Sequence, residues 1–217
     1  MIDDAATRVP VGPLAARECD VAADVLARAF RDNPLNRAVI ASENPGERLR
    51  VNRCGMASLV PAALEHGRVL AARDHGRVIG ILIGIPPGAF PLPPPPLMRR
   101  IQVLFGQGWR IALRWGRVFH FLAEQHPLER HWYLGTLGVD PDFQRRGVGR
   151  RLLSHWLQQV DVDASPAYLE TDVASNVDFY GRAGFALAEE TEFLGAAIWR
   201  MRRPAFAGEI STAPLSL

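Results

Sequence analysis

The chain has 217 residues, 48% of them hydrophobic, and a formal net charge of +2. This length supplies one sizeable core and too little material for two large domains. Because its charge is nearly balanced, the chain lacks the dense basic face typical of nucleic-acid-binding domains, and we expect no nucleic-acid partner. It contains no lysine, which excludes a P-loop NTPase and a pyridoxal phosphate enzyme.

The cysteines, the histidines and the first residues bear on the compartment and on metals. Cys19 and Cys54 lack metal-ligand spacing, which favours a reducing compartment over a disulfide framework. Residues 1–10 carry two aspartates and no apolar signal core, and no window is long and apolar enough to span a membrane. We therefore predict a cytoplasmic protein without a transmembrane segment. The six histidines form no close helical pair, so we predict no metal site.

The first half of the chain predicts two helices and a hairpin. Leu14 to Phe30 has helical periodicity and ends before Asn33-Pro34, which we interpret as a proline stop. A second helix is expected over residues 46–65. Two β-rich runs, 68–72 and 77–85, flank Asp74-His75-Gly76, a sequence typical of a hairpin turn.

Residues 86–125 form a proline-rich connector followed by a helical insertion. Residues 86–96 are too proline-dense for a sheet interior, so we expect an exposed, stiff connector. In residues 97–125, tryptophan, phenylalanine and leucine alternate with arginine. Three interpretations remain: a flap beside a ligand site, a helix on a membrane surface, or an ordinary packed insertion whose arginines face water.

The second half alternates strands and helices. The predicted strands are 131–139, 167–173, 185–189 and 194–201, the predicted helices are 150–160 and 176–182, and residues 204–217 are expected to form a tail. This order is typical of an α/β fold. We expect the final strand to be exposed, which favours a homodimer.

The most informative motif is Gln144-Arg145-Arg146-Gly147-Val148-Gly149, between a predicted strand and a predicted helix. A strand that turns through glycines into a helix leaves backbone N–H groups unpaired at the positive end of the helix dipole. Such a turn binds anions and suits a pyrophosphate. A dinucleotide-binding turn would place a third glycine where Leu152 stands, so that class is disfavoured.

Residues 131–190 resemble the GNAT superfamily of acyl-coenzyme A-dependent N-acetyltransferases. The resemblance rests on Leu134-Gly-Thr-Leu-Gly-Val139-Asp-Pro, on Gln144-Arg-Arg-Gly-Val-Gly149, and on Asn176 and Phe179-Tyr180 ahead of Gly184-Phe185. The runs 131–134 and 168–171 are similar to a branch that includes puromycin-type acetyltransferases. The resemblance implies a GNAT fold, α/β (α+β) with a mixed, mostly antiparallel central sheet and helices on both faces, here with the helical insertion. It also implies a single domain over residues 1–203, with its coenzyme A motif at 131–190.

The resemblance further implies where acetyl-coenzyme A binds as cosubstrate. The strand end would run alongside the pantetheine arm, the turn would hold the pyrophosphate through its backbone N–H groups, and Asn176 would hydrogen-bond the arm. The implied cofactor-binding residues are Leu137, Gly138, Val139, Gln144, Arg145, Arg146, Gly147, Val148, Gly149, Arg150, Asn176 and Tyr180. For Asn176 the alternative is a helix N-cap.

Catalysis requires a neutral amine, a stabilised oxyanion and a protonated leaving thiolate. Tyr180 matches the general acid of the family. The backbone N–H near Leu137 would meet the acyl oxygen as charge develops. The base candidates are Glu170 and His131, with His126, Glu192 and an ordered water as further alternatives.

The leading functional hypothesis is an N-acetyltransferase that transfers acetyl from acetyl-coenzyme A to a primary amine of a small molecule by direct attack in a ternary complex. One alternative is the same reaction on a protein or peptide amine. The other is a non-catalytic acyl-coenzyme A-binding regulatory module, which retention of Tyr180 disfavours, because binding alone needs no acid near the sulfur.

Overall fold

The computed structural model describes residues 9–206 and contains one seven-stranded sheet. Its strand order is β1-β2-β3-β4-β5-β7-β6, with β4 and β5 parallel and every other neighbouring pair antiparallel. The strands are β1 (Val11–Pro13), β2 (Arg68–Asp74), β3 (Arg77–Ile85), β4 (Trp132–Val139), β5 (Ala167–Thr171), β6 (Ala186–Phe193) and β7 (Ala196–Arg203). The α-helices are α1 (Cys19–Ala29), α2 (Pro34–Ile40), α3 (Pro45–His66), α4 (Leu97–Gln107), α5 (Trp109–Glu124), α6 (Val148–Val162) and α7 (Ala174–Gly181).

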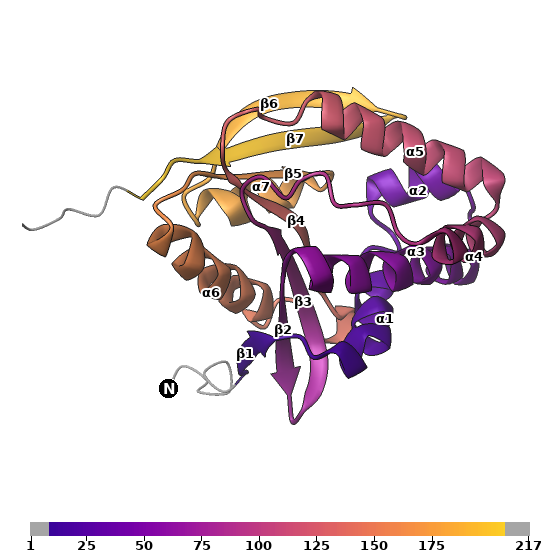
Figure 1. The fold of residues 1–217 in the computed structure, drawn as a ribbon, viewed down its shortest axis with the longest axis horizontal. Coiled ribbons are helices and arrows are strands. Elements are labelled where there is room, and N and C mark those ends of the chain that lie inside the picture. Colours follow the sequence, from indigo (N-terminus) through magenta and orange to yellow (C-terminus); the bar gives the residue numbers. More distant parts are fainter. Residues whose placement is uncertain (1–8, 207–217) are drawn as a thin grey trace, which may run out of the picture.

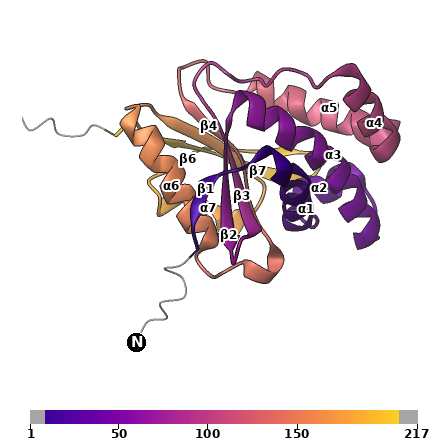
Figure 2. The same cartoon turned by 60° about the horizontal axis from the view of Figure 1, so that its bottom comes forward.

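Helices cover both faces of the sheet, as predicted (Figure 1). On one face α1 and α3 pack on β2 and β3, around Leu26, Val60 and Ile81. On the other face α6 and α7 pack around the fully buried Trp156. Figure 2 shows α6 and α7 on the opposite side of the strands from α1 and α3. The mixed, mostly antiparallel GNAT fold predicted from the sequence is confirmed.

The N-terminal segment departs from the prediction. The expected helix over residues 14–30 is shorter, since β1 and a 3-10 turn at residues 16–18 precede α1. Pro34 does not merely stop a helix: it opens α2, which the sequence analysis missed. Proline is tolerated in the first turn of a helix because the N–H that it lacks would have no intrahelical partner there.

The predicted insertion is helical and consists of two helices, since Gly108, at φ 85°, separates α4 from α5. One further expectation is wrong. The final strand is not the exposed edge, because β7 lies between β5 and β6, and β6 forms that edge. The other predicted elements are present with shifted boundaries. Of the predicted tail 204–217, residues 207–217 lie outside the described part of the chain.

The strands β4 and β5 pair over only three residues and then separate. Their register joins Trp132 with Ala167, Tyr133 with Tyr168 and Leu134 with Leu169. Beyond Leu134, β4 pairs with β3 alone. The sheet therefore opens between its two halves at the end of β4.

A β-bulge lies where this opening begins. Ile83 of β3 faces Thr136, whereas the next residue, Gly84, faces Leu134, so Gly135 is an extra residue in β4. A bulge redirects the side chains and backbone groups that follow it and is common beside active sites.

We predict that Gly84→Ala destabilises the fold. A Cβ at Gly84 would overlap the indole of Trp156, a rigid and fully buried ring. Overpacking of this kind should lower the free energy of unfolding by about 1–3 kcal/mol. Unfolding in urea measures this change. Gly116→Ala in α5 is the control, since nothing lies within 4 Å of its added Cβ and alanine favours a helix by up to about 1 kcal/mol. Equal stability of the two variants would contradict the prediction.

Candidate active site

The edge of β4 that faces the opening offers backbone hydrogen-bonding groups. The N–H of Asp140 donates to the carbonyl of Ile79 in the neighbouring strand, at 2.8 Å. Because successive residues of a strand direct their polar groups to opposite edges, Leu137 and Val139 direct theirs toward the opening. The Gln144 amide donates to the Val139 carbonyl from that side, at 3.1 Å. This edge can accept an extended ligand as an added strand would.

The glycine turn leads directly from this edge to an uncapped helix start. Gly147 is the N-cap of α6, has a φ of 79° and supplies no side-chain cap. Arg145 also has a positive φ, 60°. The first N–H groups of α6, at Val148 and Gly149, therefore face outward at the positive end of the helix dipole. The turn therefore has the uncapped backbone donors that the predicted anion site requires.

A buried carboxylate fastens the turn to the sheet. Asp140 is 1% exposed and lies 2.6 Å from the Arg28 guanidinium of α1 and 3.4 Å from that of Arg77 in β3. It also accepts from the N–H of Asp142, at 3.3 Å. Two guanidiniums and a backbone donor compensate this buried charge, so the end of β4 and the start of the turn are held to two other elements.

The predicted cofactor arginines lie around this turn. The Arg146 guanidinium lies 5.3 Å from the centre of the Phe143 ring. Arg150 and Gly147 line a hollow of about 510 Å³ between β1 and α6. These positions surround the anion site with positive charge, while the backbone N–H groups supply its fixed donors.

Two predicted cofactor glycines serve packing as well. A Cβ at Gly138 would stand 2.7 Å from Leu26 in α1, so this position permits close approach of that helix. A Cβ at Gly149 would touch Phe179 and Val139, each at 3.7 Å. Val139, Gly149 and Phe179, which are distant in sequence, thus meet at one place. The side chain of Val148 is 3% exposed and belongs to the core, so only its backbone is available to a ligand.

Tyr180 and Asn176 both lie in α7, behind the end of β5. The Tyr180 side chain is 6% exposed, and its hydroxyl has no hydrogen-bond partner within residues 9–206. Burial and then the charge of Asp172 raise the pKa of this phenol, which keeps it protonated. The Asn176 amide donates to the hydroxyl of Thr171, at 3.1 Å. Val173, not Asn176, is the N-cap of α7, which removes the helix-cap alternative for Asn176.

Glu170 occupies the opposite face of β5. Its neighbour Leu169 packs in the same core as Tyr180, and side chains alternate along a strand. Burial raises the pKa of the Glu170 carboxyl to about 7, against opposing effects of Tyr133, Tyr168 and Arg200. Neither carboxylate oxygen has a partner with hydrogen-bond geometry in the described chain. The carboxylate is therefore a desolvated group that can gain or lose a proton near neutral pH.

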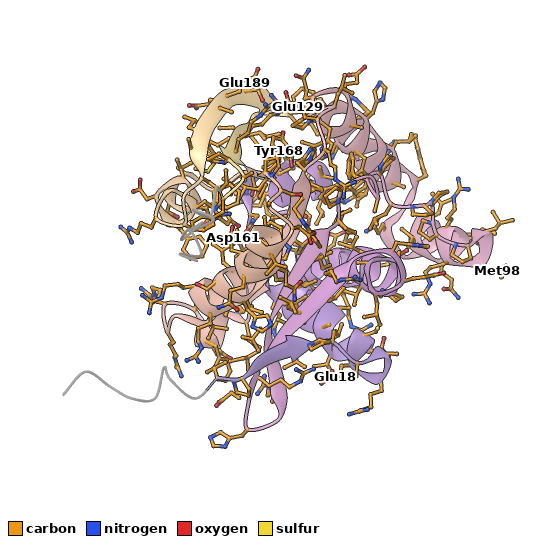
Figure 3. The ribbon with its side chains drawn as sticks, turned by 60° about the vertical axis from the view of Figure 1, so that its left-hand side comes forward. Glu18, Met98, Glu129, Asp161, Tyr168 and Glu189 are labelled. Atoms are coloured by element: carbon orange, nitrogen blue, oxygen red, sulfur yellow. The ribbon has the colours of Figure 1, made fainter. Side chains whose placement is uncertain are left out.

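Arg200 stands directly across from Glu170 in the pairing of β5 with β7. It is 2% exposed, and one of its nitrogens donates to Glu189 at 2.9 Å. Its Nε and Nη2 atoms are buried without a partner among the described residues. Figure 3 shows Tyr168 and Glu189 in the same upper part of the molecule. Arg200 was not predicted as a site residue, because only the register of two strands brings it to Glu170.

Both predicted histidines join the same cluster. The Nε2 atoms of His126 and His131 are 3.0 Å apart. Burial and then the charge of His131 lower the pKa of His126 to about 4. Phe90, from the proline-rich connector, stacks on His126 with ring centres 3.8 Å apart. The connector thus contributes to the site and is not merely exposed. The remaining base candidate, Glu192, is exposed and does not join this cluster.

Over residues 9–206, no group of three or more histidine, cysteine, aspartate or glutamate side chains could hold a metal ion. In the same part of the chain, no helix is both long and apolar enough to cross a membrane.

Comparison with known proteins identifies a family whose model matches part of the chain, and solved structures with a similar fold. The acetyltransferase (GNAT) domain family matches residues 107–187, which confirms the resemblance to the GNAT superfamily. A solved structure described as histone acetyltransferase HPA2 and related acetyltransferase, from Corynebacterium glutamicum, has a TM-score of 0.66 at 22% identity and covers 91% of this chain and 96% of its own.

Two other solved structures share the fold at lower identity. The ribosomal-protein-S18-alanine N-acetyltransferase from Escherichia coli has a TM-score of 0.54 at 16% identity, covering 93% of this chain and 97% of its own. The paia N-acetyltransferase from Thermoplasma acidophilum, in complex with coenzyme A, has a TM-score of 0.56 at 13% identity, covering 90% and 98%. At these sequence identities the similarity is evidence for the fold alone.

We predict that Glu170→Gln changes how stability depends on pH. The folded-state pKa of about 7 lies above the ordinary value of 4.5, so folding favours the protonated carboxyl. This contribution is fully present below the ordinary value and is lost as the pH rises through 7. Between about pH 5 and about pH 8, wild type should lose roughly 2–3 kcal/mol relative to Glu170→Gln.

The measurement is the free energy of unfolding in urea at both pH values. Glu192→Gln is the control, because Glu192 is exposed on β6, which β7 separates from the strand of Glu170. The difference in stability between Glu192→Gln and wild type should be the same at both pH values. If the difference in stability between Glu170→Gln and wild type were also the same at both pH values, Glu170 would not be held in a desolvated site.

Proposed function

We propose that this chain, which carries a GNAT acetyltransferase domain, is an N-acetyltransferase that transfers an acetyl group from acetyl-coenzyme A to a primary amine of a small molecule. The observation that carries the proposal is the open edge of β4, continuous with the uncapped start of α6. An extended chain of amides that ends in a pyrophosphate is complementary to this combination of edge and turn.

Acetyl-coenzyme A is the cosubstrate in this proposal, and the residues present fit it. The outward backbone groups of Leu137 and Val139 would pair with the amides of the pantetheine arm. The N–H groups from Arg145 to Arg150 would hold the pyrophosphate. When bound, the thioester supplies an activated acyl group. The paia N-acetyltransferase, similar in fold, is in complex with coenzyme A.

The chemistry can be assigned to groups on the two faces of the sheet. Glu170, with a pKa of about 7, can accept the proton that the attacking amine loses. The N–H of Leu137, after the bulge, would donate to the acyl oxygen as negative charge develops. Tyr180, kept protonated by burial, would donate its proton to the departing sulfur. His131, hydrogen-bonded to His126, is the alternative base.

A protein or peptide amine is the second candidate acceptor. Two of the proteins that share the fold are described as a histone acetyltransferase and a ribosomal-protein-S18-alanine N-acetyltransferase. The aromatic groups around Glu170, namely Phe90, Tyr133 and Tyr168, favour a compact apolar amine instead. The third alternative, a non-catalytic acyl-coenzyme A-binding module, would leave the desolvated Glu170 without a role.

The proposal is tested by thiol release from acetyl-coenzyme A across a panel of free amines and peptides. We expect turnover of at least one free amine. Tyr180→Phe should lower kcat by about a hundredfold or more, the range for losing a general acid. Coenzyme A affinity should fall by a much smaller factor than kcat, because Tyr180 would contact the cofactor only at the sulfur.

Thermal unfolding provides the control for Tyr180→Phe. The hydroxyl has no protein partner within the described residues, so its loss should leave stability within about 0.5 kcal/mol. Turnover of peptides alone would favour the protein acceptor. Binding of coenzyme A without turnover of any amine or peptide would favour the regulatory module.

The anion site predicts a specific effect of bulk at Gly147. The added side chain of Gly147→Val would enter open space in front of the α6 N-terminus, since nothing lies within 4 Å of a Cβ there. We expect coenzyme A to bind at least about tenfold more weakly in calorimetric titration, because the added bulk blocks these N–H groups. Replacing Arg145 alone by alanine should weaken binding less.

Gly76→Val is a matched control. Gly76, at the tip of the β2–β3 hairpin, has a φ of 82° and equally open surroundings. Both substitutions impose a similar backbone strain of about 1–2 kcal/mol, but only Gly147 belongs to the proposed site. Equal coenzyme A affinity of the two variants would contradict the assignment of the pyrophosphate site.

A further inference from the structure

The outer side of α4 and α5 exposes large apolar side chains that nothing in the described chain covers. Phe105 is 84% exposed, Phe119 64% and Trp109 61%. Figure 3 shows Met98, on α4, at the outer margin of the molecule. We call this surface the α4–α5 face; its apolar residues are Met98, Leu104, Phe105, Trp109, Leu113 and Phe119.

The inner sides of both helices are well anchored, so this exposure does not come from loose packing. The Gln107 amide of α4 donates to the carbonyl of Val51 in α3, at 3.2 Å. In α5, Val118 is fully buried, and Phe121 stacks on Phe193 with ring centres 4.5 Å apart. Helices whose inner sides are satisfied do not need a second apolar side for folding.

The formal charges carried by residues 97–123 of α4 and α5 are all positive, and the first acidic residue, Glu124, ends α5. No aspartate or glutamate occurs between Asp74 and Glu124. The exposed Arg100, Arg110 and Arg117 form no ion pair within residues 9–206. An apolar strip flanked by unpaired guanidiniums is complementary to a surface that is both apolar and negatively charged.

We propose that the α4–α5 face docks the protein on the surface of an anionic lipid bilayer, with Phe105, Trp109 and Phe119 entering the headgroup boundary. Tryptophan is favoured at that depth because its ring is amphipathic. Arg110, whose guanidinium lies 5.2 Å from the Trp109 ring centre, would reach the lipid phosphates from the flank. The association is peripheral and reversible.

A second copy of the chain is a poorer occupant of the same face. A two-fold interface brings identical patches together, so Arg100, Arg110 and Arg117 of the two copies would be confronted without acidic partners from this segment. Like charges across an interface oppose association. A lipid surface imposes no such repulsion and requires no matching shape.

Docking would also bring the candidate acceptor site near the membrane. The inner side of α5 carries Phe121, whose ring lies 5.4 Å from the Arg200 guanidinium. One helix, about 10 Å in diameter, and the contact of Phe121 with Arg200 would therefore lie between the lipid surface and Glu170, which faces Arg200 across the strands. An amine that partitions into the lipid boundary would be close to this site.

The test is sedimentation of the full chain with vesicles of phosphatidylcholine alone or mixed with phosphatidylglycerol. We expect binding to the anionic vesicles, weakening with salt as the arginines are screened. The double variant Phe105→Ser and Trp109→Ser should abolish it. Arg110→Gln and Arg117→Gln should each weaken it by about fivefold.

Two controls keep the test specific. Val162→Ser removes an apolar side chain that is 86% exposed at the end of α6, and Arg182→Gln removes an exposed guanidinium after α7. Both lie on the other face of the sheet and should leave vesicle binding unchanged. The substituted residues of the α4–α5 face are exposed, so the variants should fold normally.

Three outcomes would overturn the proposal. The first is no binding to anionic vesicles at low ionic strength. The second is equal binding to neutral and anionic vesicles, which would remove the role of the arginines. The third is a dimer in analytical ultracentrifugation that Phe105→Ser with Trp109→Ser converts to a monomer, which would assign the face to a second copy.

Discussion

The separation of β4 from β5 is the constraint on which the rest of the site depends. Two parallel strands that pair for three residues and then diverge leave backbone donors and acceptors unpaired, and such groups are costly unless water or a ligand satisfies them. The fold holds this opening rigid. On one side β3 keeps β4 in place, and at its end Asp140 is fastened by Arg28 and Arg77.

The same opening explains why acid and base candidates come from different layers. Tyr180 belongs to the core under α6 and α7, whereas Glu170 faces the side of α5. A ligand lying between the separated strands would be accessible from both faces, so proton acceptance and proton donation need not compete for one space. On one side lies a buried carboxylate whose pKa is near 7, and on the other lies a phenol that burial keeps protonated. These different environments suit the carboxylate to the role of base and the phenol to that of acid.

Several polar groups around Glu170 are buried without full hydrogen bonding, an arrangement that costs folding free energy. The buried Glu170 carboxylate, the Tyr168 hydroxyl and two nitrogens of Arg200 have no partner with full hydrogen-bond geometry in the described chain, although Tyr133 and Tyr168 are close enough to the carboxylate to lower its pKa. Native cores rarely leave such groups unsatisfied, and clusters of them mark places where water or a ligand completes the network. The cross-strand position of Arg200 lets it offset part of the charge of Glu170 while one of its nitrogens stays bound to Glu189.

The residues proposed for the cofactor half of the site could be named from the sequence, whereas those proposed for the acceptor half could be named only in part. Leu137 to Gly149 and Tyr180 are spaced along one strand-turn-helix unit and the helix that follows, so local pattern and resemblance reach them. Glu170 was found as a candidate, but its partners were not, because Arg200 and Phe90 reach it only through strand register and a connector that folds back. The helix at Pro34 was missed for a local reason, since proline is compatible with both a helix stop and a helix start.

The insertion shows why composition alone left three interpretations of residues 97–125. A packed helix needs one apolar side, and α5 has it in Val118 and Phe121; this accounts for the ordinary packed insertion. Phe121 also contacts Arg200, and this contact agrees with the interpretation of the insertion as a flap beside a ligand site. Neither accounts for Phe105, Trp109 and Phe119, which point away from both. Helices α4 and α5 therefore expose more apolar surface than folding and the proposed site require, and residues 97–123 carry arginines but no acidic side chain. An anionic surface would complement this pattern.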